Sequence, residues 1–140
     1  MNHCGKTSGY MVTNPKAQTD LMVQVFDSAG VHPEAVNYME IAANGSSLGD
    51  AIEITGLKKA FKQYTDKKHF CSIGTVKSNI GHLEAASGIS QLTKLICQIR
   101  HKTLVPTINT EPLNENIDLA ESPFFIQKEV MNWEKPEIKN

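Results

Sequence analysis

Hydrophobic residues recur at helical spacing in three stretches of the chain, and short apolar runs separate them. The first stretch lies between Pro15, which suits the first turn of a helix, and Gly30, which suits the residue after its end. Its apolar stripe consists of Leu21, Met22, Val25 and Phe26. This spacing predicts a helix near residues 15–29.

Two further helices are predicted downstream. Asp50, followed three residues later by Glu53, fits a capping box at the start of the second helix. The apolar positions of that helix are Ile54, Leu57 and Phe61, and those of the third, which reaches about His101, are Ile89, Leu92, Ile96 and Ile99. Apolar, β-tolerant runs near residues 36–41 and 70–76 predict strands before and after the second helix. The alternation predicts an α/β domain.

The chain after residue 101 follows a different pattern. Prolines at 106, 112 and 123 and asparagines at 109, 114 and 116 predict an irregular segment, with one more short strand at residues 124–127. We therefore divide the 140 residues into an opening segment at 1–14, a helix-strand-helix-strand-helix core at 15–101, and an irregular Pro/Asn-rich segment at 102–140.

The composition is ordinary for a globular domain. The chain is 40% hydrophobic and 21% charged with a net charge of −1, which gives no electrostatic basis for binding nucleic acid. Its apolar runs are too short to span a membrane, and the N-terminus has no basic and then apolar leader. Three unpatterned cysteines argue against a disulfide scaffold. We expect a cytoplasmic protein without nucleic-acid or membrane partners.

Candidate chemistry lies at residues 74–88, which read Gly-Thr-Val-Lys-Ser-Asn-Ile-Gly-His-Leu-Glu-Ala-Ala-Ser-Gly. Gly81 permits a turn after the strand, and Glu84 with the alanines after it favours a helix that begins near His82. Lys77 and His82 can then reach one cleft, where a fixed cation and a titratable imidazole suit an electrophilic pair. The alternative is a solvated surface lysine and an ordinary histidine in the first turn of a helix.

Residues 77–88, Lys-Ser-Asn-Ile-Gly-His-x-Glu-Ala-Ala-x-Gly, resemble the second signature of the β-ketoacyl synthase domains of modular polyketide and fatty acid synthases. Further matches follow in the family's order, at residues 2–10, 14–18, 38–41, 48–53, 104–109 and 122–125. The resemblance extends from about Asn2 to Trp133. It implies the C-terminal half of a thiolase-like fold, a layered α/β structure with a mixed sheet that lacks the N-terminal half and the final strands.

The family's active site combines a cysteine nucleophile with two histidines, and this chain departs from it first in the loop after Glu40. The synthases carry His-Gly-Thr-Gly-Thr there, whereas this chain carries Ala-Ala-Asn-Gly-Ser at residues 42–46. The methyl group of Ala42 can neither donate a hydrogen bond nor exchange a proton. Loss of one such donor typically slows a reaction by about two to three orders of magnitude, so we expect condensation to be crippled.

The second departure concerns the nucleophile. The resemblance implies that the family's cysteine lies in a half that precedes Met1 and that the closing Gly-Phe-Gly-Gly-Thr-Asn segment follows Asn140. Cys4 in the opening segment, Cys71 in an apolar strand and Cys97 on the expected inner face of a helix do not replace it, because buried thiols are inert.

Asn44 and Ser46 stand where the family's threonines face the phosphopantetheine arm of the acyl carrier protein. We expect both to hydrogen-bond that arm, although the same residues also fit a simple turn. The resemblance implies the carrier protein and the N-terminal half as partners, a homodimer in the full domain, and no directly bound cofactor. No metal site is expected, because no histidine shows metal-ligand spacing with the cysteines; these residues are His3, His32, His69 and His101.

The resulting hypothesis is part of a non-elongating ketosynthase, in which His82 and Lys77 act on an acyl thioester that is passed on without extension. One alternative is a non-catalytic docking or structural remnant of a synthase. Another is a competent condensing enzyme with a substitute for the lost histidine, which is disfavoured because residues 41–49 contain no His, Tyr or Lys. We also expect the chain by itself to associate with the missing half, to dimerise or to be poorly soluble, because its sheet edges and apolar faces lack their covering.

Overall fold

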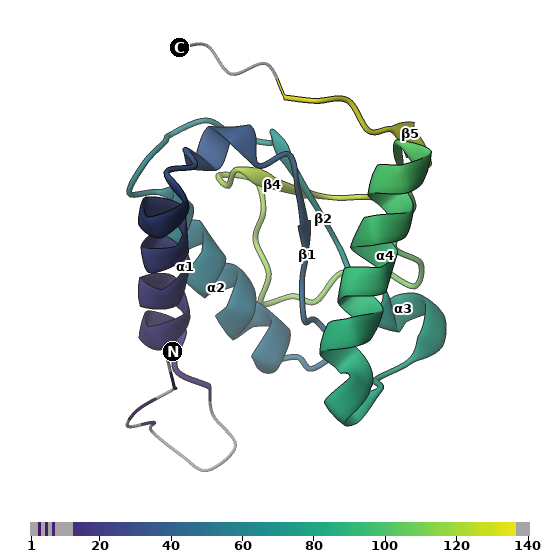
Figure 1. The fold of residues 1–140 in the computed structure, drawn as a ribbon. Helices are drawn as coiled ribbons and strands as arrows, with labels where there is room; N and C mark the ends of the chain where they lie inside the picture. The colour runs from purple at the N-terminus through teal and green to yellow at the C-terminus, as the bar shows by residue number, and fades with distance from the viewer. Residues whose placement is uncertain (1–2, 4, 6, 8–12, 137–140) are drawn as a thin grey trace.

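Helices and strands alternate along the chain, as Figure 1 shows for a computed structural model that describes residues 3, 5, 7 and 13–136. The helices are α1 (Pro15–Ala29), α2 (Gly49–Phe61), the short α3 (Lys77–Ile80) and α4 (Ser87–His101), with 3₁₀ turns at Pro33–Ala35 and Glu84–Ala86. The strands are β1 (Tyr38–Glu40), β2 (Cys71–Gly74), β3 (Thr103–Leu104), β4 (Phe124–Ile126) and β5 (Met131–Asn132).

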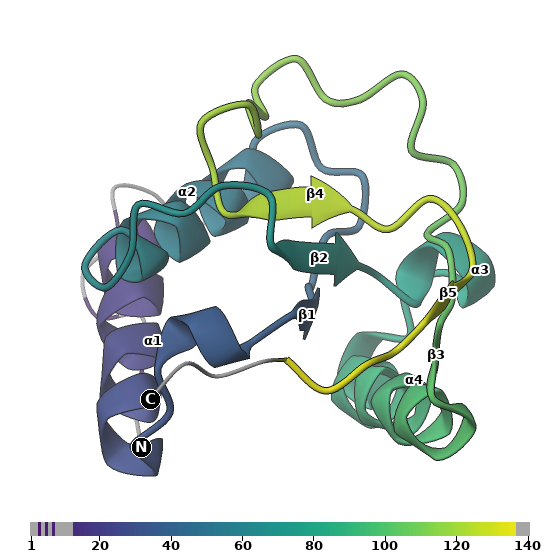
Figure 2. The ribbon, with the colours of Figure 1, turned by 90° about the horizontal axis from the view of Figure 1, so that it is seen from above.

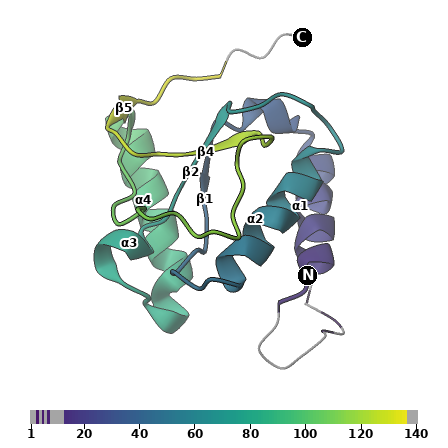
Figure 3. The same ribbon diagram turned by 180° about the vertical axis from the view of Figure 1, so that it is seen from behind.

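The main sheet has the order β1-β2-β4, and its three strands run parallel. A separate antiparallel pair joins β3 to β5. In Figure 2, helices α1 and α2 lie to one side of the main sheet and α4 lies to the other. Seen from behind in Figure 3, the chain between β3 and β4 crosses from α4 to α2 before it enters β4. That crossing is anchored at α2, where Lys58 Nζ donates to the Asp118 carbonyl at 2.8 Å.

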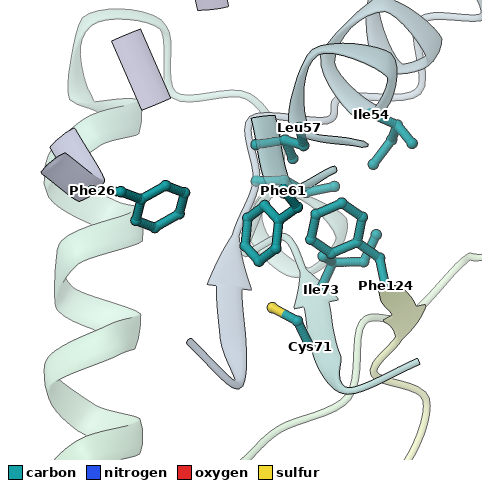
Figure 4. Close-up of a cluster of buried hydrophobic side chains, with 8 residues drawn as sticks. Phe26, Ile54, Leu57, Phe61, Cys71, Ile73 and Phe124 are labelled. Carbon is teal, nitrogen blue, oxygen red and sulfur yellow. The ribbon is translucent and has the colours of Figure 1, made fainter. Parts of the chain in front are cut away.

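The two faces of the sheet differ in polarity, because successive side chains of a strand point to opposite faces. Cys71 and Ile73 join the apolar core beneath α2 (Figure 4), whereas Ser72 and Gly74 face α4. In the core, the ring of Phe61 is fully buried and meets Phe124 edge-on at 4.9 Å between ring centroids. Among the described residues, the main buried apolar cluster therefore lies on the face of the sheet that α2 covers.

Helix α1 occupies the range that the hydrophobic spacing predicted. The Asn14 side chain accepts hydrogen bonds from the amides of Lys16 and Ala17 at 3.0 and 3.2 Å, which caps the helix. At the other end, Gly30 adopts the left-handed conformation with φ 60°, where a residue without a β-carbon is favoured. Both ends of α1 thus follow from local sequence.

The predicted capping box at α2 is wrong. The helix begins at Gly49, and its N-cap, Leu48, makes no side-chain capping bond. The Asp50 carboxylate instead accepts from the amides of Asn44 and Gly45, and Glu53 accepts from the Ala42 amide. The two acids therefore organise the preceding loop rather than the helix terminus.

The predicted start of the third helix near His82 is also wrong. Lys77 begins the four-residue α3, Gly81 then breaks the helix with φ 78° and ψ −178°, and α4 begins only at Ser87. His82 Nδ1 accepts a hydrogen bond from the Glu84 amide at 2.9 Å, and such side-chain to backbone bonds compete with helical ones. The residues of the seam therefore lie in an irregular turn.

Helix α4 turns its polar side inward. Lys94 and Gln98 are buried against the polar face of the sheet, whereas the predicted apolar stripe is exposed. The residues of this α4 stripe are Ile89, Leu92, Ile96 and Ile99, with exposed fractions of 62%, 50%, 55% and 62%. Cys97, expected on an inner face, is likewise exposed. No helix among the described residues is long and apolar enough to cross a membrane.

Candidate active site

The seam between β2 and α3 carries Lys77. The strand ends at Gly74, and Thr75 and Val76 lead into the helix, whose first residue is Lys77. The Lys77 ammonium donates a hydrogen bond of 2.5 Å to the carbonyl of Ala42, in the loop after β1. The lysine therefore joins the two loops that carry the candidate residues.

His82 is exposed at the turn after α3, and a hydrogen bond fixes the orientation of its ring. The Glu84 amide can only donate, so His82 Nδ1 is the acceptor, and the hydroxyl of Ser87 lies 3.3 Å from the same nitrogen. In the neutral imidazole the proton is then on Nε2. The Nε2–H group can therefore donate a hydrogen bond to an oxygen of a bound molecule.

The backbone at Ala42 is held from three sides. Glu53 accepts from the Ala42 amide at 2.8 Å, Lys77 donates to the Ala42 carbonyl, and Gln91 Nε2 donates to the Ile41 carbonyl at 2.9 Å. Burial raises the pKa of the Glu53 carboxyl, and the hydrogen bond from the Ala42 amide partly opposes that shift. The loop is thus fixed by its neighbours without any contribution from the alanine side chain.

A cavity of about 740 Å³ lies between this loop, the seam and the segment at residues 107–119. Lys77, His82 and Asn44 all line it, so the structure brings these three predicted residues together. Its floor is apolar and includes Ile54 and Ile73. Ala42 and Ser46 are not among the lining residues, and both are exposed.

Asn44 and Ser46 form a hydrogen-bonded turn. Asn44 Oδ1 accepts from the Ser46 amide at 3.1 Å, and Ser46 Oγ accepts from the Gly49 amide at 3.0 Å. These bonds use acceptor atoms, so the side-chain NH₂ of Asn44 and the hydroxyl hydrogen of Ser46 remain chemically able to donate. These bonds are those of a local turn, and the assignment of both residues to a pantetheine arm stays a prediction.

The structure describes two of the three cysteines, and both are free thiols. Cys71 is buried in β2, and burial raises the pKa of its thiol to about 12. Cys97 is exposed on α4, and Cys4 lies outside the described residues. No group of three or more His, Cys, Asp or Glu side chains in the described part of the chain could hold a metal ion.

The sequence reasoning missed Gln91 and Lys94, and it placed Glu53 in a helix cap, whereas its carboxylate accepts from the Ala42 amide. Gln91, Lys94 and Gln98 recur at helical spacing opposite the apolar stripe of α4, a pattern that normally indicates a solvated face. The spacing showed that this helix has one polar and one apolar face, but which face is buried depends on the sheet that α4 covers.

Comparison with known proteins identifies the family of the chain. The chain matches the family described as "Beta-ketoacyl synthase, C-terminal domain" over residues 1–111. It is 52% identical to polyketide synthase PksR and 51% identical to polyketide synthase PksM, both from Bacillus subtilis (strain 168). These matches cover 96% and 97% of this chain but only 5% and 3% of the two relatives.

Solved ketosynthase structures agree. The ketosynthase from module 6 of the bacillaene synthase of Bacillus subtilis 168 superposes with a TM-score of 0.93 at 41% identity, covering 97% of this chain and 24% of that one. The oxazolomycin ketosynthase domain OzmH KS7 of Streptomyces albus JA3453 gives 0.93 and 41%, covering 99% and 24%. This chain thus corresponds to about a quarter of each solved chain.

The fold and the seam therefore define a β-ketoacyl synthase, and the chain belongs to the C-terminal domain of that family. More particularly, it is the C-terminal part of a ketosynthase domain of a modular polyketide synthase. The predicted layered α/β, thiolase-like half-domain is confirmed.

Proposed function

We propose that this chain is part of a ketosynthase that transfers acyl thioesters without extending them. One observation supports this most strongly: the loop position of the first family histidine holds Ala42, while the hydrogen bonds that fix the backbone of the loop are complete. Lys77 and His82 of the second signature are retained and line the same cavity. Thioester handling therefore keeps its polar groups, whereas condensation loses a donor and proton carrier.

Each retained residue has a role in this proposal. The Nε2–H of His82 donates to the thioester carbonyl oxygen and stabilises the negative charge that develops on it during transfer. Lys77 holds the Ala42 loop through its bond to the carbonyl and adds a positive charge at the rim of the cavity. Asn44 and Ser46 donate to the amides of the phosphopantetheine arm, which the acyl carrier protein brings as part of the substrate.

The nucleophilic cysteine comes from the N-terminal half of the domain in this proposal. The α4 stripe supports that association, because an apolar helix face of this size is rarely left in water. The 140 residues correspond to 24% of the solved ketosynthase chains, so most of a ketosynthase domain remains to cover it. The complete domain would act as a homodimer.

The test uses the complete ketosynthase domain that contains this segment, with an acyl-loaded carrier protein and malonyl carrier protein. Mass spectrometry of the carrier-bound products should detect transfer of the acyl group, with little malonyl decarboxylation or β-ketoacyl product. Replacement Ala42→His should then raise condensation by about 100-fold or more, because it restores one donor. The matched control is Ala29→His, at an exposed alanine at the end of α1, which should change nothing. Efficient condensation by the unmodified domain would refute the proposal.

A second candidate is a docking remnant without transfer activity, which the exposed α4 stripe also favours. The same experiment separates the two functions. A complete domain whose cysteine takes up the acyl group supports transfer. A folded domain that never becomes acylated supports the docking role.

A further inference from the structure

A buried ion pair joins Lys94 of α4 to Glu40 of β1. Their side chains are 7% and 1% exposed, and Lys94 Nζ lies 2.8 Å from Glu40 Oε2. Each of the other ion pairs among the described residues has at least one side chain that is more than half exposed. Removing two charges from water costs several kcal/mol per ion, so a buried pair of this kind adds little net stability. Its location therefore calls for a reason other than stability.

The Glu40 carboxylate connects the end of β1 to the start of α3. Its Oε2 accepts from the Tyr38 hydroxyl at 2.6 Å, and its Oε1 accepts from the Val76 amide at 2.5 Å. Val76 is the N-cap of α3 and directly precedes Lys77, so this bond ties β1 to the start of α3. The Lys94 ammonium has no hydrogen-bond partner in the described part of the chain, and it lies 5.5 Å from the centroid of the Tyr38 ring. Glu40 is its partner in an ion pair.

Gln91 holds the neighbouring residue from the same helix. It lies three residues before Lys94 on α4, on the same face, and its Nε2 donates to the Ile41 carbonyl at 2.9 Å. Glu40 and Ile41 are the two residues that precede Ala42. The polar face of α4 therefore contacts the end of β1, directly before the loop that contains Ala42.

We propose that Lys94 and Gln91 are positioning residues of the ketosynthase site. Lys94 holds Glu40 as a charged acceptor, and Glu40 fixes the Val76 amide and with it the start of the helix that carries Lys77. Gln91 fixes the Ile41 carbonyl and with it the loop at Ala42. This inference rests on the proposed acyl-thioester site at Lys77 and His82, but it holds whether or not the domain elongates its substrate.

The test compares three variants of the complete ketosynthase domain: Lys94→Met, Gln91→Met and, as the matched control, Lys62→Met. Lys62 also belongs to an ion pair, with Asp66, but that pair is exposed and remote from the cavity. Hydrogen exchange followed by mass spectrometry reports on peptides that cover residues 74–84 and 38–46, with α2 as the internal reference. Stopped-flow acylation by an acyl-pantetheine thioester gives the rate constant and KM.

For Lys94→Met we expect exchange over residues 74–84 to accelerate about tenfold while α2 is unchanged, because the Val76 amide loses its acceptor geometry. For Gln91→Met the same local effect should appear over residues 38–46. The acylation rate constant should fall about 10- to 100-fold in both variants with little change in KM, as is usual when a support for reacting groups is lost. Lys62→Met should match the unmodified domain.

Two results would overturn the inference. The first is an acceleration of exchange that is equal across the domain in Lys94→Met, which indicates a purely structural pair. The second is unchanged local exchange together with an unchanged rate constant in Gln91→Met. This variant also decides the question if Lys94→Met does not fold, because it removes one hydrogen bond and no charge. Elongation of the substrate by the unmodified domain would refute the proposed function and leave the exchange results interpretable.

Discussion

Replacement Ile96→Ala tests whether the α4 stripe becomes an interior surface in the complete ketosynthase domain. Ile96 is 55% exposed in this chain, whereas Ile54, in the core beneath α2, is 3% exposed. Full burial of an isoleucine side chain stabilises a protein by about 1.5–3 kcal/mol, so the contacts within this chain realise about half of that for Ile96. Burial of the exposed half of Ile96 in the complete domain would add a similar amount of stability. Truncation of the covered side chain would then also leave a cavity.

The expected cost in the complete domain is therefore that of a core residue. Both Ile96→Ala and Ile54→Ala should lower the free energy of unfolding by about 2–5 kcal/mol. The matched control is Val25→Ala, because Val25 is 51% exposed on α1, outside the α4 stripe, and its truncation should cost less than about 1 kcal/mol.

Urea denaturation of the complete domain, followed by far-UV circular dichroism, measures all three variants against the unmodified protein. The slope of free energy against urea should stay constant across the variants, which allows the midpoints to be compared directly. A loss for Ile96→Ala no larger than that for Val25→Ala would refute the conclusion that the stripe is covered.

Three further predictions concern the described chain. Gly74→Ala should destabilise by about 1–3 kcal/mol in urea melts, because its added β-carbon would lie 2.7 Å from the Tyr38 hydroxyl, whereas Gly88→Ala meets nothing within 4 Å and should be neutral or stabilising. Iodoacetamide should alkylate Cys97 but not Cys71 in the native chain, as peptide mapping can establish, and assembly into the complete domain should protect Cys97. Because the folded-state pKa of Glu53 is raised above 4.5, the native state binds more protons, so the stability of the unmodified protein relative to Glu53→Gln should fall as pH rises from 4.5. A difference in stability that rises with pH would contradict that assignment.

Much of the fold could be predicted from the sequence, because its helices and strands have strong local signals. The range of α1 followed from one apolar stripe and two terminal residues, Pro15 at one end and Gly30 at the other. The strands were located correctly but are shorter than predicted, at Tyr38–Glu40 and Cys71–Gly74. The capping box at α2 was wrong because Asp50 and Glu53 bond to the preceding loop. The start of α4 at Ser87 was missed because His82 bonds to the Glu84 amide in an irregular turn.

Some residues of the candidate site could likewise be predicted from the sequence, and others could not. Lys77 and His82 could be found because both lie within one short motif whose residue types are themselves informative. Gln91 and Lys94 could not, because each acts on a backbone group or charge more than 30 residues away in the chain. No local pattern shows which element a side chain will face.

The sequence by itself determined the family, the alternation of helices and strands, and the loss of the first histidine at position 42, since these depend on residue identity and short-range spacing. The tertiary structure alone decided which side of α4 is buried. Local periodicity gives a helix two unlike faces, but the polarity of the surface that it meets determines which of them turns inward. Here α4 meets the polar face of the sheet, so Lys94 and Gln98 point in and the α4 stripe points out.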